Sequence, residues 1–565
     1  MKASLSLLSV GALLAACGNT ASNRPRPDMG AAGNVSVAEG GSGSPAGGAG
    51  NQDCQADLPA AALVRLSFPE LSRSVSDLLG EDAARRIDEE LELTQDDGSF
   101  PPLVSPDEGY VVDDRLFARG DQLAQRASTY VLENFEAVTG CASDYECVRD
   151  FVDTFAEQAF RRPLDEEEQS LLDRVVGGAE ALGAPPEQGA QYGVYAVLES
   201  PQFLYRTEFG PSSATGTQGE VRLSDYELAS ALSFFLTGAP PDAPLLKAAA
   251  AHALGGSEQL GPQVERLLAS AAAKTHLQGA LGNYLGIYRL SNVVIDRLLY
   301  PSWNAALATS MGVEVRSLIE SSLWSGPVSA LLTSRTAHVN ESLATLYGVA
   351  FPPPGGGLDE LGFADVQLPA ERAGLLTRAG LLTTRSRPDR ASVVARGLWI
   401  QTLICDQSPP FPEQIPDQSS TPTNPDPTER ERSEFRQEED ACKDCHVQID
   451  PYGLALDEFD AIGGYRREDP QGRPIDVKVT LPAVAGGAEV TGGAELSTAL
   501  ASEVFTKCLA QRFLEYAAPS PAPGSGTQKC QAQQLADAGE LTDDASFADV
   551  LKSVAMSRAF AYRQR

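Results

Sequence analysis

The chain has 565 residues, with 42% hydrophobic and 21% charged side chains, proportions that are ordinary for a globular protein of several domains. Its formal net charge is −33, from 77 acidic and 44 basic residues, and the sequence has no basic stripe. This acidic excess excludes nucleic acid as the expected partner and disfavours anionic surfaces. It suits a basic redox partner, although an acidic surface also serves solubility alone.

The first residues predict a secretory signal. A basic start at Lys2 precedes an apolar run over residues 5–16, which is too short to span a bilayer. The run ends in Leu14-Ala15-Ala16-Cys17-Gly18, which resembles a bacterial lipoprotein processing site. We therefore expect residues 1–17 to be a signal peptide with its lipidated Cys17, which anchors the mature protein in the cell envelope, at the outer membrane. Ordinary cleavage that discards Cys17 is the alternative.

Residues 18–52 follow this anchor and consist mostly of Gly, Ser, Ala, Asn and Pro. Such a segment has too few large apolar side chains to bury a core. We expect a disordered tether that holds the folded part off the membrane. The connector 406–427 is expected to be extended because it is rich in proline, which favours an extended backbone.

Apolar residues recur at helical spacing through most of the remaining chain, which predicts a mainly α, multi-helical fold. Capping boxes, in which Ser or Thr is followed three residues later by Glu, predict helix starts at Ser67, Ser224 and Thr428. Alternating apolar residues over 475–481 predict a strand, which the glycine pair 486–487 turns into a small β-hairpin near the C-terminus. The main expected helices are 148–160, 166–176, 190–198, 226–236, 263–284, 305–324 and 393–404.

Two stretches of the chain occur twice. Residues 65–79 align with 222–236, and residues 200–206 (Ser-Pro-Gln-Phe-Leu-Tyr-Arg) align with 557–563 (Ser-Arg-Ala-Phe-Ala-Tyr-Arg). Each half of the chain therefore opens with the first motif and closes with the second, which indicates an internal duplication. Convergence of common capping and packing patterns is the alternative.

The most informative motif is Cys442-Lys443-Asp444-Cys445-His446, which has the spacing of a c-type haem attachment site. Two thiols three positions apart can bond the two vinyl groups of one haem, and the next histidine can reach the iron as its proximal ligand. Covalent haem is normally attached outside the cytoplasm, in agreement with the export signal. We therefore expect a cytochrome c-like segment with one covalent haem c, held by Cys442 and Cys445, with His446 on the iron. A local disulfide and half a zinc site are the alternatives.

Further haem contacts are expected from residues beside and beyond the motif. A turn containing Pro and Gly should follow it and leave room for a flat cofactor. Arg466 can pair with a haem propionate, because guanidinium groups suit carboxylates. The alternative is that Arg466 is simply a charged surface residue. For the sixth iron ligand, Met556 is the only methionine after the motif and His338 is its rival. Packing is the alternative role for Met556, and His276 and His252 are further rival ligands.

Four carboxylates follow the motif closely: Asp450, Asp457, Glu458 and Asp460. Such a group can bind calcium. Carboxylates in this kind of sequence more often cap helices and accept hydrogen bonds in turns, and we favour that interpretation.

The other cysteines are expected to form disulfides, since the chain is predicted to enter an oxidising compartment. Proximity in the sequence favours Cys141–Cys147 and Cys508–Cys530, which leaves Cys54–Cys405 as a long-range bridge. Free buried thiols are the alternative for the last pair.

The chain resembles the planctomycete-type exported cytochrome c-like proteins, which are built from consecutive domains of unknown function (the 1587, 1595, 1592, 1588 and 1585 series). The resemblance extends from about residue 60 to the C-terminus and is most specific at 442–466. Further matching stretches are 159–164, 200–206, 226–230, 339–344 with 347–348, and 396–399. The chain departs from the pattern at Phe68-Pro69-Glu70, because an aromatic residue usually follows the Glu there, and at His338, which replaces a usual aromatic residue.

The resemblance implies an exported haem-bearing protein and the following domains: 53–140 (1587-like), 141–210 (1595-like), 211–350 (1592-like), 351–467 (1588-like, with the haem motif) and 468–565 (1585-like). The sequence contains no hydrolase or phosphate-loop motif that would indicate a different function. Three functions stay open. They are an electron-transfer protein with an unknown redox partner, a haem enzyme acting on an unknown substrate, a glycan-derived or other organic compound, and a structural or binding lipoprotein whose two motif cysteines form a disulfide.

Overall fold

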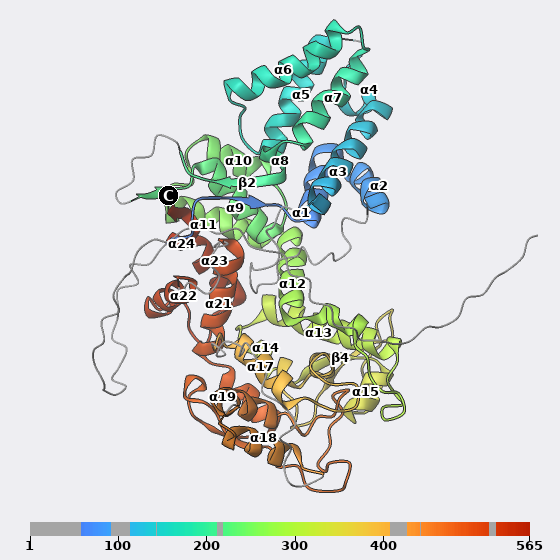
Figure 1. Ribbon diagram of the computed structural model, residues 1–565, viewed down its shortest axis with the longest axis vertical. Helices are drawn as coiled ribbons and strands as arrows, with labels where there is room; N and C mark the ends of the chain where they lie inside the picture. Colours follow the sequence, from blue (N-terminus) through green and yellow to red (C-terminus); the bar gives the residue numbers. More distant parts are fainter. Residues whose placement is uncertain are drawn as a thin grey trace, which may run out of the picture. The chain divides into compact units, whose positions relative to one another are not determined.

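The computed structural model describes residues 58–91, 114–142, 144–211, 219–406, 426–440, 442–518 and 527–564. The chain divides after Gln52, and the part from Asp53 onward is one compact unit. In the described residues the fold is mainly helical, as predicted, with four antiparallel pairs of short strands (Figure 1). Over these same residues, no helix combines the length and apolar character that crossing a bilayer requires. The predicted lipid anchor at Cys17, the tether and Cys54 lie outside the described residues.

A first core lies in the N-terminal helices. Helix α7 (Pro186–Leu198) packs against α3 (Asp114–Glu133), α5 (Tyr145–Phe160) and α6 (Glu166–Ala181) (Figure 1). Side chains such as Val148, Val152 and Val194 are fully buried between them. The shorter elements here are β1 (Ala62–Arg65), α1 (Phe68–Leu79), α2 (Glu81–Leu91), α4 (Phe135–Thr139), α8 (Pro201–Leu204) and β2 (Tyr205–Glu208).

A second, larger core extends from Leu223 to Phe560 and joins most of the remaining elements. Its long helices are α9 (Asp225–Thr237), α11 (Ser257–Leu268), α12 (Ala271–Leu285), α13 (Ala305–Ser325), α17 (Val393–Leu403), α18 (Glu429–Glu438), α19 (Lys443–Leu454), α21 (Glu503–Ala517), α22 (Thr527–Asp537) and α23 (Phe547–Met556). The shorter ones are α10 (Ala243–Ala250), α14 (Ala330–Thr333), α15 (Glu341–Tyr347), α16 (Ala379–Thr383), α20 (Gly492–Leu500) and α24 (Arg558–Ala561). The remaining strands are β3 (Glu220–Arg222), β4 (Thr336–Val339), β5 (Ala364–Gln367), β6 (Lys478–Thr480), β7 (Glu489–Thr491) and β8 (Tyr562–Gln564).

Several of these elements lie where local sequence signals predict them. The capping boxes that begin at Ser67, Ser224 and Thr428 are formed at the starts of α1, α9 and α18. The predicted hairpin exists as β6 paired with β7. The single helix predicted over 263–284 is wrong, because the chain forms α11 and α12 instead. The hydroxyl of Ser270 accepts the Ala273 N–H at 3.1 Å, and this cap starts a new helix within the apolar pattern.

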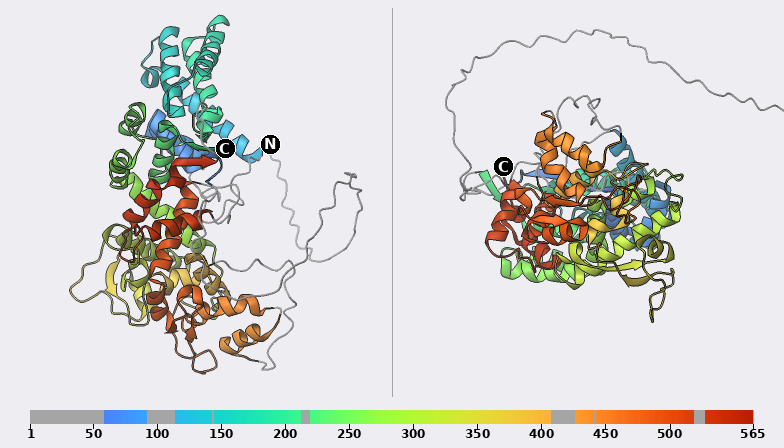
Figure 2. Two further views of the ribbon diagram at one scale, coloured as in Figure 1. Left: turned by 90° about the vertical axis from the view of Figure 1, so that its left-hand side faces the viewer. Right: turned by 90° about the horizontal axis from the view of Figure 1, so that it is seen from below.

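The predicted duplication is visible in the strand pairing. Strand β1 pairs antiparallel with β2, and β3 pairs antiparallel with β8. Both views of Figure 2 show the red C-terminal end of the chain beside green elements from earlier in the sequence. The registers are equivalent, since Arg65 lies opposite Tyr205 just as Arg222 lies opposite Tyr562. The next hydrogen bond is also repeated, from Leu66 N to the Leu204 carbonyl and from Leu223 N to the Ala561 carbonyl. Equivalent pairing of four separate segments is stronger support for duplication than a common capping motif.

Glu208 joins the two repeats. Its Oε2 accepts hydrogen bonds from Arg563 Nε at 2.8 Å and Nη2 at 2.5 Å, and its Oε1 lies 3.3 Å from Nη1 of Arg206. Arg206 and Arg563 occupy equivalent places in the two closing motifs, and all three side chains are buried. A buried carboxylate shared by two guanidinium groups compensates charges that are costly to bury alone.

The disulfides confirm one prediction and correct two. Cys141 is bonded to Cys147, as expected from proximity. Cys405 is bonded to Cys508, 103 residues away, so the predictions Cys508–Cys530 and Cys54–Cys405 are wrong. The reason is that α17 packs against α21 and brings the two Cα atoms to 5.2 Å, a contact that sequence distance does not report. Cys530 is itself disulfide-bonded.

Candidate functional site at the Cys-x-x-Cys-His motif

The motif lies at the start of α19, which packs against α17, α18 and β6 (Figure 1). Cys442 is the N-terminal cap residue, and Cys445 and His446 lie in the first turn. Positions three apart on a helix are surface neighbours, about 5–6 Å between Cβ atoms, so the two thiols lie on one side of the helix. Both cysteines are half-buried and free, not bonded to each other.

The turn predicted after the motif is instead helical. Helix α19 continues through Pro451 and Gly453 to Leu454. Proline is tolerated there because it removes only one backbone donor near the end of the helix. The close packing of α17 accounts for the glycine, since a Cβ on Gly453 would lie 1.9 Å from the Val393 carbonyl oxygen.

Asp450 organises the inner side of the motif. It lies one helical turn after His446, and its Oδ1 is 2.9 Å from His446 Nδ1. Its other oxygen accepts hydrogen bonds from the Ser433 hydroxyl at 2.8 Å and from Arg436 Nε at 3.0 Å. The Asp450 side chain is completely buried, whereas 18% of the His446 side chain is exposed. Asp450 therefore ties α19 to α18 and holds one side of the imidazole ring.

The segment after α19 is held by a buried arginine from α17. Arg396 Nη1 donates to the carbonyls of Leu456 at 2.8 Å and Phe459 at 2.7 Å, and its Nη2 donates to the carbonyl of Asp460 at 2.7 Å. Burial lowers the pKa of Arg396 to about 10. A second buried guanidinium, Arg372, donates to the Gly463 carbonyl at 2.6 Å. These contacts fix the chain for about ten residues beyond the helix.

Each of the four carboxylates after the motif has structural partners. Besides the Asp450 contacts, Asp457 pairs with Arg466, Glu458 accepts the Gly493 N–H at 3.2 Å, and Asp460 accepts two backbone N–H groups in a turn. Burial raises the pKa of Asp457 and of Asp460, and raises that of Glu458 to about 6. No group of three or more potential metal ligands exists among the described residues. These contacts agree with the expected capping and turn roles rather than with a calcium site.

The remaining residues that were predicted to contact the haem interact with other parts of the protein. Arg466 Nη2 lies 3.3 Å from a carboxylate oxygen of Asp457, so its guanidinium already has an anionic partner. Met556 is on α23, which packs against α11, α13, α21 and α24. His338 lies between Asp359 and Asp365, with ring nitrogens 3.2 and 2.8 Å from their carboxylates. Neither predicted sixth ligand is on an element that packs closely with α19.

The two rival histidines also lie elsewhere. His276 is buried against Arg73 and Tyr516, and burial lowers its pKa to about 3. His252 is exposed, with Nδ1 at 3.0 Å from Asp225. Their neighbours account for them without a haem.

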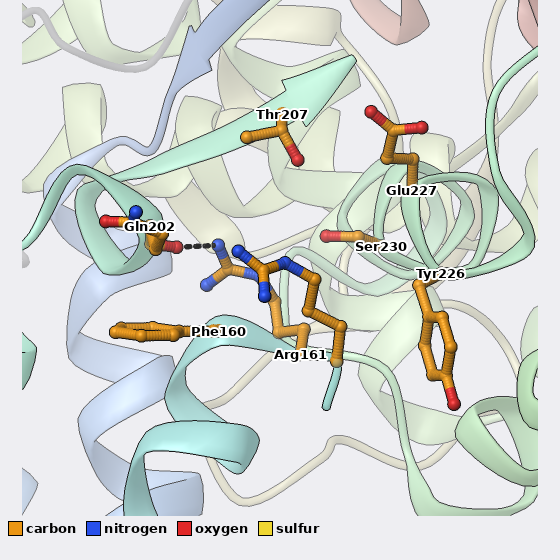
Figure 3. Close-up of a pocket in the computed structure, with 8 residues that line it drawn as sticks. Phe160, Arg161, Gln202, Thr207, Tyr226, Glu227 and Ser230 are labelled. Atoms are coloured by element: carbon orange, nitrogen blue, oxygen red, sulfur yellow. Dashed lines mark hydrogen bonds between the residues drawn. The ribbon is translucent and has the colours of Figure 1, made fainter. Parts of the chain in front are cut away.

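A small pocket forms where the two repeats meet, away from the motif (Figure 3). The figure shows Arg161 donating to the Gln202 carbonyl, at 2.6 Å, and the Ser230 hydroxyl facing the same space. Arg161 also donates to the carbonyls of Ala159, Phe203 and Tyr205, so its donors are occupied by backbone. The family-like stretches 159–164, 200–206 and 226–230 therefore meet here as a structural joint. The lining residues are Phe160, Arg161, Arg162, Gln202, Thr207, Tyr226, Glu227 and Ser230.

Sequence reasoning missed two of the residues that build the haem-motif site. The acidic pattern alone marks Asp450 as one of four carboxylates after the motif, although its spacing of four from His446 places both on one face of a helix. Arg396 stands out in the sequence only as part of a family-like stretch. A single arginine in the apolar segment 393–404 was the available signal, because an unpaired charge in a buried helix needs partners supplied by tertiary structure.

The fold and the motif together define a mainly helical, multidomain protein with the ligand pattern of a c-type haem. Three family models match the chain, each described as a protein of unknown function: DUF1595 (PSD5) at residues 147–208, DUF1592 (PSD4) at 223–349 and DUF1588 (PSCyt3) at 372–469. The chain belongs to the planctomycete-type cytochrome c-like domain series, whose domains follow here in consecutive order. The motif lies within the third match. No curated protein and no solved structure matches the chain.

Proposed function

We propose that this chain is an exported, lipid-anchored c-type haem protein with a redox role in the cell envelope. The observation that carries the proposal is the motif on α19. It combines two free thiols at the required spacing with a histidine whose Nδ1 is engaged by Asp450, so Nε2 is the nitrogen available to iron. The donor set therefore fits a haem. The cytochrome-like name of the matching domain and the predicted export signal support the same function.

In this proposal Cys442 and Cys445 hold the haem by thioether bonds and His446 ligates its iron. The bound haem supplies one-electron transfer between its ferric and ferrous states. The protein's own part is orientation. Asp450 fixes the imidazole, and Arg396 fixes the chain beyond the helix. The negatively charged protein favours a positively charged redox partner.

A haem enzyme is the second candidate, and one observation favours it. Met556 and the histidines other than His446 are packed or paired in other parts of the fold, so none of them is placed as a sixth ligand. Haem iron without a second protein ligand can bind small molecules. Binding of carbon monoxide to the reduced protein would favour the enzyme, and a six-coordinate spectrum that does not change would favour electron transfer.

The test is the mass and spectrum of the mature protein from a host with cytochrome c maturation. Wild type should carry one covalent haem in intact-mass measurement and give a pyridine haemochrome spectrum. Cys442→Ser or Cys445→Ser should leave at most one thioether, and His446→Ala should reduce the yield of holoprotein. The double variant Cys141→Ser/Cys147→Ser is the matched control, because it removes two disulfide-bonded cysteines outside the motif, only six positions apart, and should keep the haem.

A mature wild type without haem mass, with Cys442 bonded to Cys445, would overturn the haem proposal and leave the structural lipoprotein. The anchor is tested separately. Cys17→Ser should move the protein from the membrane fraction to the soluble one. A wild type that is already soluble after export would contradict the lipid anchor and leave the haem proposal unaffected.

A further inference from the structure

We propose that Asp450 is a positioning residue that holds His446 in its Nδ1–H tautomer and so keeps Nε2 bare as the ligand for iron. This inference rests on the proposed haem function, but its first test does not need the haem. It begins from the 2.9 Å contact between His446 Nδ1 and Asp450 Oδ1.

The direction of that hydrogen bond follows from the other partners of Asp450. Arg436 and Ser433 both donate to Oδ2, at 3.0 and 2.8 Å, and a guanidinium has no acceptor atom. Arg436 also balances the charge of the carboxylate, which is completely buried. An ionised carboxylate only accepts hydrogen bonds, so the hydrogen between Asp450 and His446 belongs to Nδ1. The neutral ring then carries no hydrogen on Nε2, which is the form that binds a metal.

The same geometry predicts that Asp450→Asn, the most conservative substitution at this position, reverses the tautomer of His446. In Asp450→Asn the amide oxygen must face Arg436, because an NH₂ group there would meet the donors of Arg436. The NH₂ group then faces His446 Nδ1 and donates to it. His446 is forced into the Nε2–H tautomer, with a hydrogen on the atom that should bind iron. A change of a single atom is therefore expected to reverse the tautomer while the packing stays intact.

A second substitution, at Arg436, should restore the Nδ1–H tautomer of His446. In the double variant Asp450→Asn/Arg436→Glu a carboxylate oxygen takes the place along the side chain that Arg436 Nε has in wild type, 3.0 Å from Oδ2 of Asp450. A carboxylate only accepts hydrogen bonds, so the NH₂ group of the amide turns toward it. The amide oxygen can again accept from His446 Nδ1. Rescue by exchanging a neighbouring donor for an acceptor distinguishes tautomer control from a general loss of stability.

The experiment is nitrogen NMR of the imidazole rings in the full mature chain without haem. Both motif thiols are replaced by alanine, so that neither haem nor a local disulfide forms. The chain has only four histidines, and a His446→Gln variant assigns the relevant signal. Wild-type Asp450 should give the Nδ1–H tautomer, Asp450→Asn the Nε2–H tautomer, and the double variant Nδ1–H again. Unchanged signals from the other three histidines verify that each variant is folded.

The second readout uses the chain with its thiols intact, matured with haem. Asp450→Asn should lower the yield of holoprotein, and any haem that is attached should have a raised midpoint potential, because the ring has lost its anionic partner. An Asp450→Asn protein that keeps the Nδ1–H tautomer, or a wild type with Nε2–H, would overturn the inference. If the tautomers behave as expected but wild type carries no haem, the proposed function fails and the positioning role of Asp450 stands.

Discussion

Replacing Arg396 by methionine should destabilise the part of the protein that carries the haem motif. Arg396 is completely buried and donates to three carbonyl oxygens beyond α19, at 2.7–2.8 Å, and to the Ser386 hydroxyl at 3.2 Å. Methionine fills a similar volume but has no donor. The substitution therefore removes the guanidinium donors from three carbonyl oxygens. The Leu456 and Asp460 carbonyls each keep one backbone N–H donor, from Phe459 and Gly463, at 3.2 Å.

The magnitude follows from these contacts. The Phe459 carbonyl loses its guanidinium donor at a cost of about 1–3 kcal/mol, and each of the other two lost hydrogen bonds to the charged group costs about 1.5–3 kcal/mol, while removing a buried charge returns part of that sum. We expect the free energy of unfolding to fall by about 3–5 kcal/mol. The measurement is urea unfolding followed by circular dichroism and by tryptophan fluorescence, with the stability change taken from the midpoint at an unchanged slope.

Arg390→Met is the matched control, because it makes the same substitution on an arginine that is half-exposed and paired with its neighbour Asp389. Its effect should stay within about 0.5 kcal/mol. The reasoning would be refuted if Arg396→Met lost less than about 1 kcal/mol, or if the two variants behaved alike. Either result would mean that the carbonyls find other donors, so the guanidinium is not what holds this segment.

Three further predictions concern other parts of the fold. Glu208→Gln leaves two buried arginines without a full counter-charge and should cost about 3–5 kcal/mol in urea unfolding; a loss below 1 kcal/mol would show that the repeats do not depend on this carboxylate. The double variant Cys405→Ala/Cys508→Ala opens a loop of 103 residues and should cost about 2–5 kcal/mol, measured under oxidising conditions, and an unchanged midpoint would contradict it. Burial raises the pKa of Glu458 from 4.5 to about 6, so the folded state binds this proton more tightly and the stability contribution falls as pH rises through 4.5–6. Glu458→Gln should therefore gain about 1–2 kcal/mol over wild type at pH 7 and little at pH 4, and equal differences at both pH values would exclude this cause.

The sequence determined those features that depend on residues close together in the chain. The capping boxes starting at Ser67, Ser224 and Thr428 begin helices because each cap needs only the next three residues. The disulfide Cys141–Cys147 and the hairpin of β6 and β7 are local for the same reason. The motif of thiols and histidine could also be recognised directly, since its chemistry depends on spacing along one helix. The duplication was visible because both copies kept their residue order.

Tertiary structure alone decided the contacts between distant segments. Cys405 meets Cys508 because α17 packs on α21, and no local pattern states which helices will touch. Arg396 finds its carbonyl partners about 60 residues further on, where burial makes the pairing necessary. The orientation of His446 depends on Asp450, and the hydrogen of that bond is placed by Arg436 from another helix. The packing of α18 on α19 therefore determines which ring nitrogen of His446 carries the hydrogen. The five residues of the motif do not determine it, because both contacts come from residues outside the motif.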